Sequence, residues 1–565
     1  MVRAGIFIGV DRTGNLQKLN DAASGAARMH QWALSQGMGD GTHAKLITDQ
    51  GGKKVTPDSI YDAIADIVNG PGVDQLILYF AGHGVNINRG EHWLLSDAPV
   101  RSSAAIDVRG SVELARYCGI GHVVVISDAC RVAPEGIQAQ NVRGIDVFPN
   151  ESASDRAKPV DQFFACLLGR TAAEIKDPND AAGGFSALYT DAMLDALSGK
   201  STDVLEPAGV AGDVSYYVKP VKLQAFLERE IPLRVSRLKK EKKVNQNPDA
   251  ILIAHTNWLA KVAGLPPGTE VDDALPLSFS PDVTMAVIRA LSPSIDPPTE
   301  QIAKILAQGF GPDHFESQCG VKVRGDAIMS FSMNQGNAQL LGPDGDLLRV
   351  EPHGKPTSLL LRFREGKGTV IPALPGYIAA LTFDEGELID LAYEPSTNTG
   401  LWNDYVGRAD ALRALRADVA AATHHGRFRL DRSSDPLAFA RKLQYAKGID
   451  PGLAVYAAYA YHDLQQMDLI GEMSMYLKDS LKGFSFFDLA LLSRRLVGKT
   501  IQRGLGIIPF IPMLSQAWPL LRAHRIQLPK QLDGIEGTLL SSTWSLFDAR
   551  GVDMLENALM SGEVL

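Results

Sequence analysis

Cysteine is rare in this chain, because only 4 of its 565 residues are cysteine. Their spacing fits neither a disulfide framework nor a cysteine-rich zinc site, and so few thiols are typical of a reducing compartment. Long apolar runs are also missing. The stretch 505–514 is interrupted by Pro509 and Pro512, whereas a membrane-spanning helix needs about 20 apolar residues. The apolar run 4–10 is too short for a signal peptide. We therefore expect a cytoplasmic protein without a membrane partner.

The sequence has no excess of basic residues either. It contains 56 Lys and Arg against 65 Asp and Glu, a net charge of −9, whereas nucleic-acid binding normally needs a clustered basic surface. No nucleic-acid partner is expected. The pair His424-His425 has no further ligands at zinc spacing, so neither a metal site nor a cofactor is expected. A hydrophobic content of 45% is ordinary for globular protein, and the length predicts about two to four domains.

The first 130 residues alternate between strand-like and helix-like segments. The strand-like segments are apolar runs without strict polar alternation, which is typical of strands buried on both faces. The expected strands cover residues 4–10, 45–48, 75–80 and 122–127, and the expected helices cover residues 21–35, 57–68 and 111–118. Alternation of this kind predicts an α/β class with a parallel sheet covered by helices.

Two of these strands are followed by side chains with catalytic chemistry. His83 comes after the run 75–80, and Cys130 comes after the run 122–127. Ligands of open parallel sheets collect at the carboxyl ends of the strands, and a His beside a Cys can act as general base for a thiolate nucleophile. A cysteine at a strand end taken alone is more often a small core hydrophobe. The two segments together favour catalysis.

The pattern resembles prokaryotic members of the caspase, metacaspase and paracaspase group of cysteine peptidases. His83 precedes Cys130 by 47 positions, close to the interval of about 50 in caspases. The run 163–168 is similar to the next strand of the family, and residues 183–194 are similar to its following helix. The resemblance covers about residues 1–260. It implies a caspase-like α/β fold with a mostly parallel sheet and helices on both faces.

The resemblance also implies catalytic roles. Cys130 is the expected nucleophile, and His83 is expected to protonate the leaving amine and later to activate water. In the family, the backbone N–H groups of the glycine after the histidine and of the cysteine itself hold the oxyanion. Gly84 and Cys130 stand at those positions, and each such donor contributes about 2.7–4 kcal/mol. A cysteine endopeptidase is the expected activity.

Two carboxylates predict the specificity. Metacaspases carry an aspartate two residues before the cysteine and another in an Asn-Asp pair at the first helix, and this chain resembles them at Asp128 and Asp21. Two carboxylates favour a substrate Arg or Lys, so cleavage after a basic residue is expected. The chain departs from metacaspases at Ala81, where serine is usual, and from animal caspases at Asp128, because Gln-Ala-Cys is usual there. Asp21 alternatively caps a helix, Asp128 alternatively bonds loop N–H groups, and cleavage after Asp is the competing specificity.

A loop at residues 131–160 follows the nucleophile directly and is rich in Pro, Gly, Asn and Ser. The family often cuts itself at this place. Given the expected preference for basic residues, self-cleavage is predicted after Arg143, Arg156 or Lys158. A charged, solvated loop is an equally good interpretation.

The rest of the sequence predicts three further segments. Residues 261–316 contain recurring prolines, typical of a linker with short helices. Residues 317–398 hold short alternating runs and a strong turn signal at 342–346, which predict a small β-sandwich or meander. Residues 399–565 predict an α-helical domain. These additions are large enough to receive an activating signal or a protein partner.

We therefore expect a regulated, bacterial-type peptidase that acts on a protein or peptide substrate. Relatives with such additions act in stress response, anti-phage defence or controlled cell death, which is an implication of the resemblance alone. Calcium activation, as in some metacaspases, stays open. Two competing hypotheses are a catalytically silent caspase-like binding or scaffold module, and a ligase or transamidase that passes the acyl group to an amine.

Overall fold

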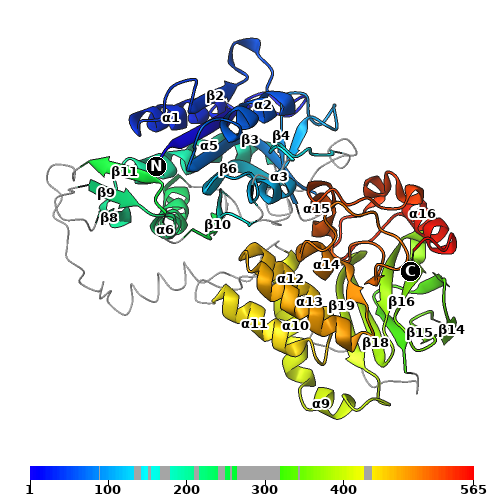
Figure 1. The fold of residues 1–565 in the computed structure, drawn as a ribbon. Helices are drawn as coiled ribbons and strands as arrows, with labels where there is room; N and C mark the ends of the chain where they lie inside the picture. The colour runs from blue at the N-terminus through cyan, green and yellow to red at the C-terminus, as the bar shows by residue number, and fades with distance from the viewer. Residues whose placement is uncertain are drawn as a thin grey trace. The chain divides into compact units, whose positions relative to one another are not determined.

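A computed structural model describes most of the chain as two compact units, Met1–Asp282 and Val283–Leu565. Figure 1 shows the fold of each unit. The described residues are 1–87, 90–132, 142–150, 154, 156–165, 178–208, 215–238, 248–254, 257–263, 318–341, 344–424 and 435–564, with the backbone alone for 130–132, 178–187, 235–238, 421 and 424. Most of the expected linker, residues 264–316, therefore lies outside the described residues.

The first unit is built on one central sheet of mostly parallel strands. The strands are β1 Arg3–Gly9, β2 Ala44–Thr48, β3 Gln75–Ile87, β4 Gly90–Leu94, β5 Ala105–Asp107, β6 His122–Val132, β7 Val160–Phe164 and β10 Asp249–Ile251. In the described residues their order is β10-β7-β6-β3-β1-β2, with β4 paired to β3 and β5 paired to β4. Neighbouring strands in the order β7-β6-β3-β1-β2 pair parallel. Strand β10 pairs antiparallel with β7, β4 with β3, and β5 with β4. The predicted α/β class with a mostly parallel sheet is confirmed.

Helices cover both faces of this sheet. They are α1 Ala22–Ser35, α2 Pro57–Val68, α3 Val108–Ala115, α5 Pro178–Leu197 and α6 Pro220–Leu238. Because side chains alternate along a strand, Tyr79 and Ile126 join a core with α1, α5 and α6. Their neighbours Phe80 and Val125 join a second core with α2 and α3.

Local caps set where two of the helices begin. Helix α2 starts at Pro57 because the Thr56 side chain accepts a hydrogen bond from the Ser59 N–H. The Ser59 hydroxyl in turn accepts a hydrogen bond from the Thr56 N–H. Its bounds are those predicted. Helix α3 starts at Val108, three residues before the predicted start, because the Asp107 side chain accepts from the Gly110 N–H at 3.1 Å.

The two strands that carry the candidate dyad are longer than the sequence predicts. Strand β3 was expected to end at residue 80 and continues to Ile87, and β6 continues from 127 to Val132. Tertiary pairing causes this extension, because β4 pairs with the end of β3 and the β3–β6 ladder continues along the same residues of β3. His83 and Cys130 therefore lie within the ladder, and the prediction that they follow the strand ends is wrong.

A small sheet completes the described part of the first unit. It contains β8 Leu205–Pro207, β9 Ser215–Val218 and β11 Ala260–Ala263. All three pair antiparallel in the order β11-β9-β8.

The second unit begins with strands, as the sequence predicts. They are β12 Gly320–Arg324, β13 Ile328–Met333, β14 Asn337–Leu341, β15 Leu347–Glu351, β16 Thr357–Phe363, β17 Gly368–Ala373, β18 Tyr377–Asp384 and β19 Glu387–Pro395. The described strands form one sheet in the order β14-β15-β12-β18-β19 and another in the order β13-β16-β17. A short parallel pair, β20 Ser485–Phe486 and β21 Ile507–Ile508, lies further along the chain.

Helices dominate the remainder of the second unit. They are α9 Trp402–Val406, α10 Ala409–His424, α11 Pro436–Ala446, α12 Gly452–Asp463, α13 Met467–Ser480, α14 Phe487–Leu492, α15 Trp518–Ala523 and α16 Ala549–Met560. Residues 493–548 are less helical than expected, because they hold mainly turns, β21 and short helices. Pro509 and Pro512 each remove a backbone donor, and Gly504 and Gly506 adopt φ values of 98° and 66°.

Strands and helices of the second unit share one hydrophobic core. The core joins Leu381 of β18 and Leu391 of β19 to Tyr456 of α12 and Val552 of α16. Helix α12 contacts β19, and Figure 1 shows α12 and α13 on the same side of that strand. The segments expected as a β domain and a helical domain thus contribute to the same core, and the expected boundaries at 260, 316 and 398 stay predictions.

Candidate active site

The β3–β6 ladder pairs the two candidate catalytic residues with each other. In the parallel register, His83 is the direct partner of Cys130, just as Ala81 is the partner of Asp128. Paired strands lie about 4.8 Å apart, so the two backbones are immediate neighbours. Alternation assigns positions 81, 83 and 128 to the sheet face that α1, α5 and α6 cover. The Cys130 side chain lies outside the described part of the structure.

The imidazole of His83 has a defined hydrogen-bond partner. Its Nε2 atom lies 2.8 Å from the carbonyl oxygen of Gln17, in the loop between β1 and α1. A carbonyl oxygen can only accept, so Nε2 carries the proton and Nδ1 is the basic nitrogen of the neutral ring. His83 is buried, with 9% of its surface exposed. This burial lowers the pKa of His83, and the bond to Gln17 opposes the shift. The neutral ring is the form that a general base requires.

Backbone hydrogen bonds fix the loop that contains Gln17. The Leu19 N–H donates to the Asp11 carbonyl at 2.8 Å, and the Gly14 N–H donates to the Ser96 carbonyl at 2.9 Å. Gly14 has a φ of +47°, and a Cβ there would lie 2.3 Å from the Ala98 carbonyl oxygen. Only glycine fits this position without a shift of the loop.

Asp128 is buried inside the layer between the sheet and the helices. Only 2% of it is exposed, and its Oδ2 atom accepts from the Thr190 hydroxyl of α5, which in turn bonds the Tyr79 hydroxyl. Burial raises the pKa of Asp128 to about 8, and the bond from Thr190 opposes that shift. The carboxyl is therefore protonated at neutral pH. Thr190 supplies a hydroxyl next to Asp128, whereas Ala81, the partner of Asp128 on the neighbouring strand, has none.

Asp21 lies at the start of α1, but its side chain makes no capping bond. That helix end is capped by Asp11, whose Oδ1 atom accepts from the Ala23 N–H at 3.0 Å. Burial raises the pKa of Asp11, and the bond from Ala23 opposes the shift. Among the described residues, no hydrogen bond or ion pair joins Asp21 to Asp128, and the pairing of these two carboxylates in one pocket stays a prediction.

Gly84 lies inside the sheet next to His83. It pairs with Trp93 of β4 on one side and with Arg131 of β6 on the other. Its proposed role as an oxyanion donor stays a prediction. Gln17 and Thr190 were not predicted from the sequence, because a backbone carbonyl carries no residue signature and Thr190 lies in a helix 60 residues after Cys130.

Three residues were predicted as self-cleavage sites, and all three are described. Arg143 and Arg156 are exposed, and Lys158 is half-buried. The backbone beside Arg143 is firmly packed, because Ile145 exchanges bonds with Ala105 and Asp107 at 3.0 Å each. A Cβ on Gly144 would lie 2.5 Å from the Asp107 nitrogen. The loop residues 133–141, 151–153 and 155 lie outside the described residues.

The described residues contain no group of three or more His, Cys, Asp or Glu side chains that could hold a metal ion. None of their helices is both long enough and apolar enough to cross a bilayer.

Comparisons with known proteins add little. No protein-family model matches the sequence, and no curated protein matches it. Among solved structures, the crystal structure of protein GSU0716 from Geobacter sulfurreducens aligns with 14% identity. The alignment covers 47% of this chain and 96% of that one, with a TM-score of 0.27. Such a weak likeness carries no argument about fold or function.

Proposed function

We propose that the first unit is a caspase-like cysteine endopeptidase with Cys130 as nucleophile and His83 as general base. The observation that carries the proposal is the direct pairing of His83 with Cys130 on adjacent parallel strands. The neutral Nε2–H tautomer of His83 supports it, because this tautomer has its basic nitrogen at Nδ1. The mostly parallel sheet with helices on both faces is compatible with a caspase-like fold.

The chemistry follows from these two groups. The Cys130 thiol gives its proton to Nδ1 of His83, and the sulfur forms a bond with the substrate carbonyl carbon while the C=O electrons move to oxygen. The C–N bond then breaks, and the His83 imidazolium protonates the leaving amine. Water attacks the thioester with His83 as base, which releases the acid and restores the thiol. The Gln17 carbonyl accepts from Nε2–H throughout and so stabilises the imidazolium.

Cleavage after Arg or Lys is the proposed specificity, and it rests on Asp128. Because this carboxyl is buried and protonated at neutral pH, a substrate guanidinium beside it would favour the ionised form and release a proton. The Thr190 hydroxyl already bonded to Oδ2 would then stabilise the carboxylate. The proposed substrates are proteins or peptides. A role in stress response, anti-phage defence or cell death, and activation through the second unit or by calcium, rest on the resemblance alone.

A peptide-cleavage assay on the full chain tests the proposal. Fluorogenic peptides ending in Arg, Lys or Asp are incubated with wild type, Cys130→Ala and Cys118→Ala. Loss of a nucleophile is expected to lower kcat by roughly 10⁴-fold or more. Cys118 is the matched control, because it is buried in the core with α2 and α3 and has no assigned role. Equal activity of Cys130→Ala and wild type would contradict the proposal. Activity only after Asp would contradict the proposed specificity.

Thiol labelling separates an enzyme from a silent binding module. Cys118 and Cys319 are 2% and 1% exposed. Burial raises the pKa of Cys118 and raises that of Cys319 to about 12, so both should react slowly with chloroacetamide at pH 7. Cys130 is expected to be alkylated first, in a reaction that His83→Ala slows. A silent module would show no preference for Cys130, and joined fragments instead of hydrolysed ones would identify a ligase.

A further inference from the structure

A cavity of about 340 Å³ opens in the second unit. Its wall combines the turn before β18, the connection between α11 and α12, and the end of α13. The residues that matter for its chemistry are Tyr377, Lys447, Pro451, Tyr476, Leu481 and Lys482. This volume lies within the range of about 300–1,000 Å³ that is typical of small-molecule sites.

The charge of the wall has one sign. Lys447 and Lys482 are its charged members among the described residues, and no acidic side chain is present among them. The Lys447 ammonium lies 4.2 Å from the centre of the Tyr476 ring and donates to the Gln444 carbonyl at 3.1 Å. An ammonium has three donors, so it keeps donors for an acidic group of a ligand. Partial burial lowers the pKa of Lys447, and a bound anion would reverse that shift.

Much of the rest of the wall is apolar, and Thr399 and Ser480 add hydroxyl groups to it. Pro356, Pro451, Leu477 and Leu481 are buried contributors to it, and the Tyr476 ring, 53% exposed, stands at its edge. Burial raises the pKa of Tyr377 to about 12, so its hydroxyl remains a donor at neutral pH. Such a surface favours a ring system over a flexible chain, because aromatic and proline surfaces pack against planar groups.

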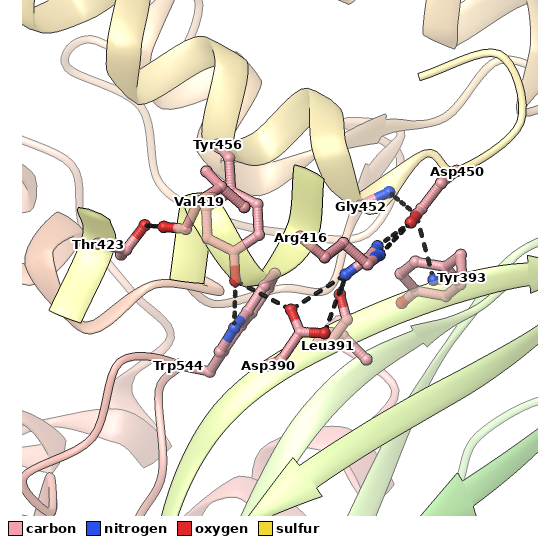
Figure 2. Close-up of polar contacts among 10 residues, drawn as sticks. All are labelled: Asp390, Leu391, Tyr393, Arg416, Val419, Thr423, Asp450, Gly452, Tyr456 and Trp544. Carbon is pink, nitrogen blue, oxygen red and sulfur yellow. Dashed lines mark hydrogen bonds and ion pairs between the residues drawn. The ribbon is translucent and has the colours of Figure 1, made fainter. Parts of the chain in front are cut away.

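A buried ion cluster fixes the segment of the cavity wall that contains Pro451. Asp450, adjacent to Pro451, accepts from the Tyr393 and Gly452 N–H groups at 3.1 and 3.0 Å and bonds Arg416 of α10. Arg416 also binds Asp390 of β19, at 3.0 and 3.1 Å. Figure 2 shows the guanidinium between the two carboxylates. The connection from α11 to α12 is thereby fixed to β19 and α10 before any ligand arrives.

The cluster is completed by two aromatic donors. The Tyr456 hydroxyl donates to Asp390 at 3.2 Å, and Trp544 Nε1 donates to the Tyr456 oxygen at 2.9 Å (Figure 2). A wall fixed in this way avoids the entropy loss of ordering a loop upon binding.

We propose that this cavity binds a small aromatic acid, whose planar ring packs against Tyr476 and Leu481 and whose carboxylate pairs with Lys447. Three features support this occupant together: the size of the cavity, the aromatic and apolar surface of Tyr476, Pro451 and Leu481, and the presence of lysines without acidic side chains among the described lining residues. The site is independent of the peptidase chemistry in the first unit. Through this site, the second unit recognises a ligand of defined chemistry.

Matched probes test the proposal on the full chain. Naphthalene-2-carboxylate and naphthalene-2-carboxamide have the same ring and differ in charge. Isothermal titration is expected to show the acid binding about tenfold more tightly than the amide, which corresponds to about 1.4 kcal/mol for one ion pair. Added salt should weaken the binding of the acid and leave the binding of the amide unchanged.

Variants locate the site. Lys447→Gln should reduce binding of the acid to the level of the amide, and Tyr476→Ala should weaken both probes. Lys478→Gln is the matched control, because Lys478 is exposed on α13 and does not line the cavity. Thermal melting verifies that each variant is folded. Equal binding of acid and amide, an effect of Lys478→Gln equal to that of Lys447→Gln, or no binding of the acid at all would overturn the proposal.

Discussion

The Nε2 atom of His83 donates a hydrogen bond to the backbone carbonyl of Gln17, 2.8 Å away. The bond connects β3, which carries His83, to the loop between β1 and α1. It sets the tautomer of the imidazole and places Nδ1 in the basic role. Because the acceptor is a backbone atom, the geometry of the loop controls the proposed catalyst more than the side chain at position 17 does.

The pH dependence of peptide cleavage should reflect the buried imidazole. Since burial lowers the pKa of His83 below 6.5, the neutral base persists to lower pH than a free histidine would. Activity should therefore fall as the pH decreases through a midpoint below 6.5. The measurement is kcat/KM of wild type as a function of pH. His83→Ala should lower kcat/KM by about 10²–10⁴-fold at the pH optimum of wild type. An acidic midpoint above 6.5 would contradict the assignment of His83.

A change in the loop should affect catalysis through Gln17. Gly14→Ala introduces a Cβ that meets the Ala98 carbonyl oxygen at 2.3 Å, so the loop must move and the bond to His83 is lost. We expect kcat/KM to fall by roughly 10–100-fold.

Gly37→Ala is the control for this experiment. Gly37 has a φ of +83°, but a Cβ there meets nothing within 4 Å. The Gly37→Ala substitution therefore introduces backbone strain without displacing the loop, and the variant should retain the activity of wild type. If both variants retained full activity, the loop would have no part in catalysis.

The buried carboxyl of Asp128 should make the stability of the fold depend on pH. Its pKa is raised from 3.8 to about 8, so between these values the folded state holds one proton more than the unfolded state. The free energy of unfolding should fall with rising pH in this window, by at most about 1.4 kcal/mol per pH unit. Asp128→Asn should remove this slope, which urea unfolding at several pH values measures. Asp62→Asn, on the exposed side of α2, should leave the slope as in wild type.

If the protein cleaves itself, the order of cleavage should follow the packing of the backbone. The segment after Arg143 is held by Ile145 in two bonds of 3.0 Å, so a peptidase can reach it only after local opening. The segment after Arg156 is also held, by the bond from the Lys158 N–H to the Arg116 carbonyl at 2.7 Å, but Lys158 makes one such bond where Ile145 makes two. Cleavage after Arg156 should therefore come first. Mass spectrometry over time, with Cys130→Ala as the inactive control, determines the order. Earlier cleavage after Arg143 would show that this segment opens readily.

The ion cluster of the second unit should contribute strongly to its stability. Arg416→Leu leaves Asp390 and Asp450 buried without their partner, and breaking a buried pair costs about 3–5 kcal/mol. Arg413 of the same helix is the control, because it pairs with Asp410, which is 95% exposed, and such surface pairs contribute about 0–1 kcal/mol. Denaturant unfolding of Arg416→Leu and Arg413→Leu should show this difference. Equal losses would mean that the cluster contributes little.

Local signals in the sequence predicted α2 and the parallel strands well, whereas the start of α3 was missed although its cap at Asp107 is also local. The predicted bounds of α2 agree with the structure because the reciprocal bonds of Thr56 and Ser59 lie within one turn. The apolar runs likewise predicted the parallel strands, since burial on both faces leaves a visible composition. The ends of β3 and β6 were wrong, because pairing with β4 extends them and that pairing is not local.

The sequence by itself determined which residues are chemically able to react, namely His83 and Cys130, and that a mostly parallel sheet carries them. Only the tertiary structure decided that these two positions pair directly, that Gln17 orients the imidazole, and that Asp128 is a protonated carboxyl under α5. The reason is physical. Residue type sets intrinsic reactivity, whereas register, burial and hydrogen-bond partners arise from segments distant in the chain, and these determine the proton positions on which the proposed reaction depends.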